Sequence, residues 1–352
     1  MAYTTIDDPG LFFNTLTSTG TGNAQAVTGL GFQPDWIWGK RTDGTGHHTL
    51  FDSVRGITKG LETTSDNAEF TSTDYYSAFG SDGFTIAAGG AGTGNGNGET
   101  GVHWCWKAGT AFSNDASSTG VGTIDSAGSI NTTSGFAILT TTGTGSAGTI
   151  AHGLGVAPHM IISKRRDDSR HWKVGHNGND STAPWTKYLE LSNANGVGDY
   201  TTWNDTAPTT TVFSVDGSSG TNGGSETYVH YVFAPVKGYS KFGRYLGAGS
   251  TDGTFVYTGF RPAWIMVKKI NSGSDEWNIF DNKRDVDNVI EQRLVANVNA
   301  ANAAGTYVDF VSNGFKWRIN NNLANGSGNT YIYMAFAESP FVSSNKVPNN
   351  AR

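Results

Sequence analysis

The sequence has little cysteine, little charge and no long apolar run. Its one cysteine, Cys105, has no partner for an internal disulfide, so disulfide bonds cannot hold the fold together. Only 15% of the residues are charged and the formal net charge is −6. The Lys and Arg residues form no dense run, which argues against a nucleic-acid-binding protein. No apolar stretch reaches the roughly 18 residues that a membrane-spanning helix needs.

The first residues, "MAYTTIDDPGLFF", lack the basic and apolar regions of a secretory signal. We therefore expect synthesis in the cytoplasm, with no need for an oxidising compartment, and no insertion into a membrane.

Glycine and aromatic residues are abundant. Glycine supplies 48 of the 352 residues, which is about twice its average share. There is no Gly-X-Y period, so the chain is not collagen-like, and the periodic aromatic residues argue against disorder. Many short strands joined by glycine-rich turns fit this composition, and the sequence predicts an all-β protein.

One motif occurs three times along the chain. The copies are "GFQPDWIWGKR" (31–41), "GVAPHMIISKRR" (155–166) and "GFRPAWIMVKK" (259–269). Each copy is followed by an Asx-Gly turn dipeptide and then by an aromatic closing strand. The turns are Asp82-Gly83, Asp216-Gly217 and Asn313-Gly314, and the closing strands are "GVHWCWKAG" (101–109), "YVHYVFAP" (228–235) and "YIYMAFAE" (331–338). This order predicts three tandem β-sandwich repeats, covering 1–118, 119–238 and 239–352.

The pattern inside each repeat predicts where its strands lie. The segment after each Pro is apolar on both faces, which places it at the centre of a sandwich. The basic pairs that follow mark where the strand reaches the surface, and they are Lys40-Arg41, Lys164-Arg165 and Lys268-Lys269. The closing strand alternates, so Trp104 and Trp106 should face the interior of their own sandwich. Segment 284–305 has apolar residues at helical spacing, but the corresponding segment 186–196 alternates, so we predict strand there.

Four further stretches are distinctive, and they are "WNDTAPTTTVFSV", "GYSKFGRYLGAGSTDGTFVYTGFRPAW", "NGFKWRI" and "TYIYMAFAESPFVSSNKVPNNAR". Through them the chain resembles a family of tailed-phage virion proteins, of the kind found in phages of marine and aquatic bacteria and described as tail-fibre-like. The resemblance covers nearly the whole chain. It implies repeated concanavalin-like or jelly-roll-like β-sandwiches and a virion location. It brings no catalytic residues. The chain begins almost directly with the first repeat and shows no heptads, unlike fibres with an anchoring domain and a shaft.

The resemblance implies a structural protein at the periphery of a phage particle. We expect a tail-fibre or adsorption protein that contacts the host surface by multivalent binding, with host glycan as a candidate ligand. The alternatives are a capsid decoration, head-fibre or tail-wall protein without a host ligand, and a glycan depolymerase spike. The expected partners are other virion proteins of the tail or capsid and further copies of the chain, as a homo-oligomer with a trimer as the first choice.

No catalytic, metal or cofactor site is predicted. His47 and His48 are adjacent and His171 and His176 are five residues apart, so on strands each pair points to opposite faces. The glycine-rich segment 89–100 has no Asp to bind calcium, and we interpret it as a flexible loop. Glycan hydrolysis needs two facing carboxylates, and nothing in the sequence pairs any two of the acidic residues. The closing-strand residues His103 and His230 are predicted to be structural and half-buried.

The candidate ligand residues are aromatic side chains that lie outside the repeated motif, because sugar rings stack on aromatic faces. In the middle repeat and its neighbours these residues are Trp172, Trp185, Tyr200, Trp203, Tyr75, Tyr76 and Trp277. The alternative interpretation is that they cap sandwich edges or fill a subunit interface.

Overall fold

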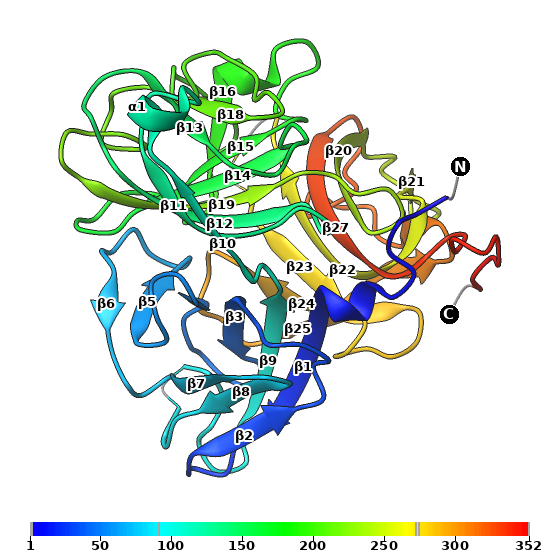
Figure 1. The fold of residues 1–352 in the computed structure, drawn as a ribbon. Coiled ribbons are helices and arrows are strands. Elements are labelled where there is room, and N and C mark those ends of the chain that lie inside the picture. Colours follow the sequence, from blue (N-terminus) through cyan, green and yellow to red (C-terminus); the bar gives the residue numbers. More distant parts are fainter. Residues whose placement is uncertain (1–2, 91, 272, 274, 351–352) are drawn as a thin grey trace.

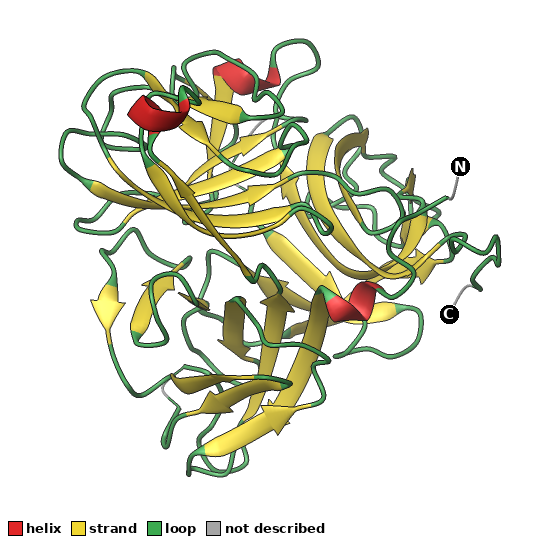
Figure 2. Ribbon diagram, viewed as in Figure 1, coloured by secondary structure: helices red, strands yellow, loops and turns green. Residues whose placement is uncertain are grey.

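The regular secondary structure of the chain is almost entirely β-strand, which confirms the predicted all-β class (Figure 2). The computed structural model describes residues 3–90, 92–271, 273 and 275–350. Its helical segments are the short η1 (Pro9–Leu11), α1 (Ala116–Thr119) and η2 (Pro184–Thr186). No helix in these described stretches is long and apolar enough to cross a membrane.

The strands form three units, which we number in chain order. The first unit contains β1 (Phe13–Thr19), β2 (Gln25–Thr28), β3 (Trp36–Arg41), β4 (Thr49–Asp52), β5 (Lys59–Glu62), β6 (Phe70–Thr71), β7 (Tyr76–Gly80), β8 (Gly83–Ile86) and β9 (Thr100–Trp106). The second contains β10 (Thr110–Asn114), β11 (Ser126–Asn131), β12 (Phe136–Thr142), β13 (Gly148–Ala151), β14 (Met160–Arg165), β15 (Lys173–His176), β16 (Lys187–Glu190), β17 (Gly198–Asp199), β18 (Val212–Val215) and β19 (Thr227–Phe233). The third contains β20 (Ser240–Leu246), β21 (Phe255–Tyr257), β22 (Phe260–Lys269), β23 (Asn278–Asp281), β24 (Ile290–Val295), β25 (Ala303–Val311), β26 (Gly314–Trp317) and β27 (Thr330–Pro340).

The main sheets of the three units have the same strand order. The order is β1-β9-β3-β4-β5 in the first unit, β12-β19-β14-β15-β16 in the second and β20-β27-β22-β23-β24 in the third, with antiparallel pairing. In each sheet the closing strand (β9, β19 or β27) lies between the first strand of that sheet's order (β1, β12 or β20) and the strand after the Pro motif (β3, β14 or β22). Figure 1 shows the units around a common centre, coloured blue to cyan, green, and yellow to red. β10 lies before the predicted boundary at residue 118 but pairs with β11 of the second unit.

Each main sheet is buried on both faces. One face of the first unit's sheet, with Ile37 and Cys105, packs on the small sheet β2-β8-β7 and forms the unit's own core. The pairs β13-β18 and β21-β26 take the same position in the other units. Trp104 and Trp106 are on the opposite face. Both faces of the closing strand are therefore buried in apolar cores, and the larger side chains lie on the face opposite the unit's own core.

That opposite face belongs to a core that all three units share. The cluster contains Trp36 and Trp106 of the first unit together with rings of the second and third. Ring pairs that link the units, with their centroid distances, are Trp36–Tyr231 at 4.4 Å, Trp106–Trp264 at 5.7 Å and Phe233–Phe336 at 6.1 Å. The expectation that Trp104 and Trp106 fill the interior of their own sandwich is therefore wrong. These residues join the sandwiches to one another.

Two further expectations are wrong and one is confirmed. Lys40, Lys164 and Lys268 do not mark the surface, because all three are fully buried beside a neighbouring unit. Asp216-Gly217 follows β18 rather than preceding it, so it is not equivalent to the hairpin turn at Asp82-Gly83. Segment 284–305 forms strand, as predicted, because β24 and the start of β25 lie within it and pair with each other.

Because the three units share a core, we expect a destabilising substitution in one unit to increase the unfolding of another. Trp264→Ala removes a ring that packs on Trp104 and Trp106, and should lower the free energy of unfolding by about 3–5 kcal/mol. Because Cys105 is buried in the first unit, its rate of labelling by a thiol reagent reports opening of that unit. We expect Trp264→Ala, in the third unit, to speed this labelling. Unchanged labelling in a variant that is destabilised to this extent would show that the units open independently.

Candidate functional site: the seams between the units

The units meet at three seams that have the same backbone contacts. At each seam a loop after the Pro-motif strand of one unit exchanges two backbone hydrogen bonds with a loop of another. The pairs are Glu69 N–Arg166 O and Arg170 N–Asp66 O, both 2.8 Å, at seam 1–2; Val197 N–Ile270 O, 3.2 Å, and Asp275 N–Ala194 O, 3.0 Å, at seam 2–3; and Asn302 N–Thr42 O, 2.8 Å, and Gly46 N–Asn299 O, 2.9 Å, at seam 3–1. The chain therefore closes a ring of three units.

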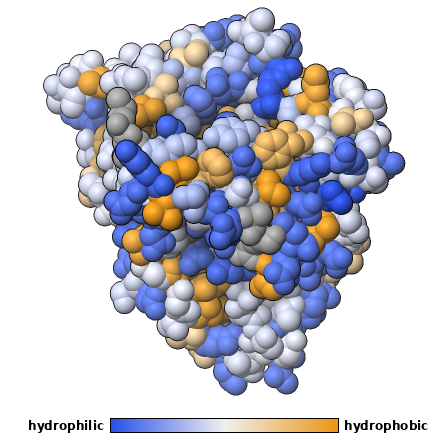
Figure 3. Space-filling view, turned by 90° about the vertical axis from the view of Figure 1, so that its right-hand side faces the viewer, coloured by the Kyte–Doolittle hydropathy of each residue, from blue (hydrophilic) through white to orange (hydrophobic). Residues whose placement is uncertain are grey.

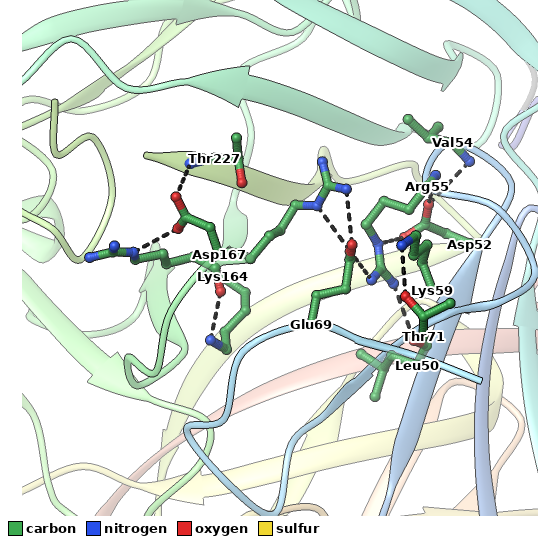
Figure 4. A network of polar contacts seen from close by, with 12 residues as sticks. Leu50, Asp52, Val54, Arg55, Lys59, Glu69, Thr71, Lys164, Asp167 and Thr227 are labelled. Carbon is green, nitrogen blue, oxygen red and sulfur yellow. Dashed lines mark hydrogen bonds and ion pairs between the residues drawn. The ribbon is translucent and has the colours of Figure 1, made fainter. Parts of the chain in front are cut away.

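Seam 1–2 contains a buried ionic network (Figure 4). The Asp52 carboxylate accepts hydrogen bonds from Arg55 Nε at 2.6 Å and from the hydroxyl of Tyr231, on the second unit's closing strand, at 2.7 Å. The side chains of Asp52 and Arg55 are fully buried. Burial opposes the charge of Arg55, but Asp52, Tyr231 and Glu69 outweigh this effect and raise the pKa of the guanidinium. The network therefore holds its charges inside the protein.

Glu69 connects this network to the second unit. Its carboxylate accepts from Arg55 Nη1 at 2.9 Å and from Arg166 Nε and Nη2 at 2.9 and 3.1 Å. Burial alone would raise the pKa of Glu69, but the hydrogen bonds from Arg166 and Arg55 lower it. Figure 4 shows Glu69 between the two guanidinium groups, so two carboxylates face two cations at this seam.

Seam 3–1 repeats the arrangement with fewer charges. Asp281 accepts from Arg284 Nε at 2.7 Å and from the indole Nε1 of Trp104 on the first unit's closing strand at 3.0 Å. Arg284 Nη1 donates to Asn302 at 2.6 Å, where Arg55 at seam 1–2 donates to Glu69. The position of Arg166 is taken by Thr42, as the backbone pairs above show. Seam 3–1 therefore lacks the second carboxylate and its guanidinium partner.

Among the described residues, seam 2–3 has no Asp–Arg pair equivalent to those of the other two seams, and its residues explain why. The closing-strand position of Trp104 and Tyr231 is Met334 in the third unit, and its side chain has no N–H or O–H to offer a carboxylate. The position of Asp52 and Asp281 is His176, whose Nε2 lies 3.1 Å from the carbonyl of Tyr333 and whose Nδ1 accepts from Gly178 N at 2.9 Å. Burial lowers the pKa of His176 to about 3, so it stays neutral.

A buried lysine lies at each seam. Lys40 and Lys164 donate to the carbonyls of Arg41 and Arg165, and Lys268 donates to Ala194 of the second unit at 2.7 Å and to Asp275. Burial lowers the pKa of all three ammonium groups to about 8. The lysines hold the loop carbonyls in place, and the seams enclose them.

Polar clefts lie over two of the seams, and another lies within the second unit. The cleft at seam 3–1 has a volume of about 610 Å³ and is lined by Thr17, Thr19, Thr42, Lys283, Arg284 and Asn302, among others. A second cleft of about 530 Å³ is lined by the corresponding threonines of β12 together with Arg166, and by loops next to β10 and β11. At seam 2–3 the cleft is only about 170 Å³. Hydroxyl, amide and charged groups predominate in the cleft at seam 3–1.

Two of the predicted ligand aromatics belong to the repeated framework. Trp172 is fully buried and Trp277 is 1% exposed. Their indole Nε1 groups donate to the carbonyls of Glu62 and Glu190 in the preceding unit, at 2.8 and 2.9 Å. His48, beside the Val295 carbonyl, takes this position in the first unit. Because this position is a histidine in the first unit, its equivalence to the two tryptophans could not be recognised from the sequence. Both tryptophan rings are buried, so neither Trp172 nor Trp277 has a face free for a sugar.

The other predicted aromatics are mostly buried in the cores of single units. Trp185 and Trp203 pack edge to face at 5.8 Å in the second unit. Tyr76 is fully buried and bonds His103 at 2.8 Å, and Tyr75 is half-buried. Stacking on a sugar is therefore wrong for Trp185, Trp203 and Tyr76, as for the two framework tryptophans. Tyr200 is 58% exposed and is the one predicted ring that lies open to solvent.

The closing-strand histidines are more deeply buried than expected. His103 bonds Ser18 and Tyr76, and His230 bonds Thr141 and Ser163, at 2.7 to 3.0 Å. Burial lowers the pKa of both rings to about 3. They are structural, as predicted, but fully rather than half-buried.

Segment 89–100 also has a structural role in its described part. The buried Asn95 amide donates to the carbonyls of Asn23 and Ala87 at 2.9 and 2.7 Å. Ala91 lies outside the described residues. The expectation of a flexible loop is therefore wrong around Asn95. Within the described residues no group of three or more His, Cys, Asp and Glu side chains is placed to hold a metal ion.

The seam 1–2 network should be costly to break on one side. Arg55→Met leaves Asp52 and Glu69 without the guanidinium that lies between them, and should lower the free energy of unfolding by about 3–5 kcal/mol. Arg41→Met, which removes a more exposed pair with Glu99, should cost about 0–1 kcal/mol. Urea unfolding of both variants measures the difference. Equal losses would contradict a structural role for the buried network.

We expect the three buried lysines to increase the free energy of unfolding at alkaline pH. Their folded pKa of about 8 lies below the unfolded value of 10.5, so between these values the unfolded chain holds more protons and stability rises with pH. We expect the free energy of unfolding to increase by about 1 kcal/mol for each lysine between pH 8 and 9.5. The triple variant Lys40→Met, Lys164→Met, Lys268→Met should lose this slope. Denaturant unfolding of the native chain and the triple variant between pH 8 and 9.5 tests this prediction. The same dependence of the unfolding free energy on pH in the two proteins would refute it.

Comparison with known proteins supplies a family but no function. No curated protein matches the chain. Residues 8–340 match a family described as a domain of unknown function, DUF7483. Because the match spans nearly the whole chain, from before β1 to the end of β27, the protein belongs to the DUF7483 family.

Proposed function

We propose that the protein is a non-enzymatic structural component at the periphery of a phage particle, and that it contacts the host surface as a tail-fibre or adsorption protein. The observation that supports this most directly is the closed ring of three units around one aromatic core. Such a body presents many loops on a rigid support, which suits attachment through several weak contacts. The sequence resemblance to tailed-phage virion proteins supports the particle location.

The distribution of titratable groups is consistent with a role in binding rather than catalysis. The histidines and lysines with the largest pKa shifts, such as His103 and Lys164, are buried in cores and seams rather than aimed into a cleft. The face that holds both termini is largely hydrophilic, with hydrophobic residues in small groups between polar ones (Figure 3). A surface of this kind suits weak contacts with polar partners such as host glycans.

The proposed partners are other virion proteins and further copies of the chain. A homo-oligomer, with a trimer first, remains part of the proposal because peripheral proteins match the symmetry of the particle. Sedimentation of the purified chain gives its mass in solution directly.

Immunogold labelling of purified phage particles tests the proposed location. Antibody raised against the purified chain should label the tail end of intact particles. Particles of a phage that lacks the gene serve as the control and should remain unlabelled. Label spread symmetrically over the head would favour a capsid decoration protein, and chain recovered from infected cells but absent from particles would contradict a virion role altogether.

A further inference from the structure

The cleft at seam 3–1 differs from the equivalent position at seam 1–2 in charge. At seam 1–2 Glu69 and Arg166 lie over the buried Asp52–Arg55 pair and balance each other. At seam 3–1 the corresponding residues are Asn302 and Thr42, which carry no charge. The loss of both side-chain charges coincides with a cleft of about 610 Å³ over the seam.

Lys283 adds a cation that the framework of the seam does not require. Its backbone N–H donates to Asp281 at 3.0 Å, as the backbone of Val54 does to Asp52 and that of Gly178 does to His176. Since Val and Gly serve at the same position, the lysine side chain has no part in closing the seam. Within the described residues its ammonium group makes no hydrogen bond or ion pair, and it lines the cleft.

The cleft is therefore positive at one end and rich in hydroxyls at the other. The buried carboxylate of Asp281 pairs with Arg284, which leaves the Lys283 ammonium as a second cation at this end of the cleft. Asp43, which also lines the cleft, shares Arg41 with Glu99. Asp285 bonds the backbone of the β24 region and is not among the residues that line the cleft.

The hydroxyl wall is formed by the outer end of β1. Thr17 and Thr19 alternate with Ser18, so both side chains project toward the third unit, and both are exposed. Their hydroxyls make no hydrogen bond within the described part of the chain. Asn302 is held in position by Arg284 and by its own donation to Gln292 Oε1 at 2.5 Å. Fixed amides and free hydroxyls suit a ligand with many hydroxyl groups.

We propose that this cleft binds an acidic saccharide, whose carboxylate pairs with the ammonium group of Lys283. The nearly buried guanidinium of Arg284 stays paired with Asp281 beneath it, and the ring hydroxyls bind at Thr17, Thr19 and Thr42. The assignment deepens the proposed contact with a host surface, and it rests on that proposal only for the natural source of the sugar. A volume of about 610 Å³ accommodates a short oligosaccharide.

Calorimetric titration of the full chain with trigalacturonate tests the assignment. Maltotriose provides the hydroxyls without the carboxylates, and tetraglutamate provides carboxylates without sugar rings. We expect trigalacturonate to bind and to weaken as salt is raised, because the contact includes an ion pair. We expect at least about tenfold weaker binding of each control ligand.

Two variants localise the binding. Lys283→Met should weaken trigalacturonate binding about tenfold or more, whereas Lys59→Met, which removes the same charge near seam 1–2, should leave it unchanged. The double variant Thr42→Arg, Asn302→Glu rebuilds the Glu69–Arg166 pair over the cleft and should abolish binding while raising or keeping the melting temperature. If the double variant does not fold, the two lysine variants decide alone.

Three outcomes overturn the inference. They are no binding of trigalacturonate to the native chain, equal binding of maltotriose or tetraglutamate, and no effect of Lys283→Met. None of these affects the labelling of particles, so a chain found on the tail but unable to bind trigalacturonate refutes the sugar site alone. A chain that binds it but is absent from particles refutes the proposed location alone.

Discussion

The aromatic core shared by the three units is the constraint on which the rest of the structure depends. Each unit has a small core of its own, but each also has a sheet face with large rings that no partner inside the unit can cover. An uncovered face of this kind would expose a large apolar surface to water. The units therefore pack against one another. Polar side chains of the main sheets that face a neighbouring unit are buried in the seams, where they need hydrogen-bond partners.

The seams show how buried charge is made compatible with that core. Asp52 and Asp281 are buried where the neighbouring closing strand offers a donor, from Tyr231 or Trp104. Where the strand has Met334, the position is His176, which burial keeps neutral. This substitution follows from the large desolvation cost of a carboxylate without hydrogen-bond donors. The same logic makes seam 3–1 distinctive, because Lys283 has no counter-ion there among the residues that the structure describes.

Much of the fold could be predicted from the sequence, whereas the site could not. The apolar run after each Pro and the alternation in 186–196 are local signals, and they led to the correct strands. The sequence did not show which face of the closing strand packs in the unit's own core and which packs in the shared core. An alternating pattern assigns side chains to two faces of a strand, but it does not indicate what covers each face. Lys40 looked like a surface residue for the same reason, since only the neighbouring unit buries it.

The residues of the proposed saccharide cleft were missed because they depend on contacts between units. Trp172 and Trp277 looked like extra aromatics because their equivalent in the first unit is His48. A comparison of Lys283 with Val54 and Gly178 could have indicated an extra cation in the third unit. This comparison requires knowing that Asp281, Asp52 and His176, two residues earlier in each case, are equivalent. The free hydroxyls of Thr17 and Thr19 gave no signal in a chain rich in threonine.

Native-state hydrogen exchange of the three closing strands tests most directly whether the units form one cooperative body. The account predicts that the slowest amides of β9, β19 and β27 exchange with the same free energy, equal to that of global unfolding, because no closing strand can open while the common core stays intact. Clearly different values for the three strands, with one unit exchanging while the others remain protected, would contradict it.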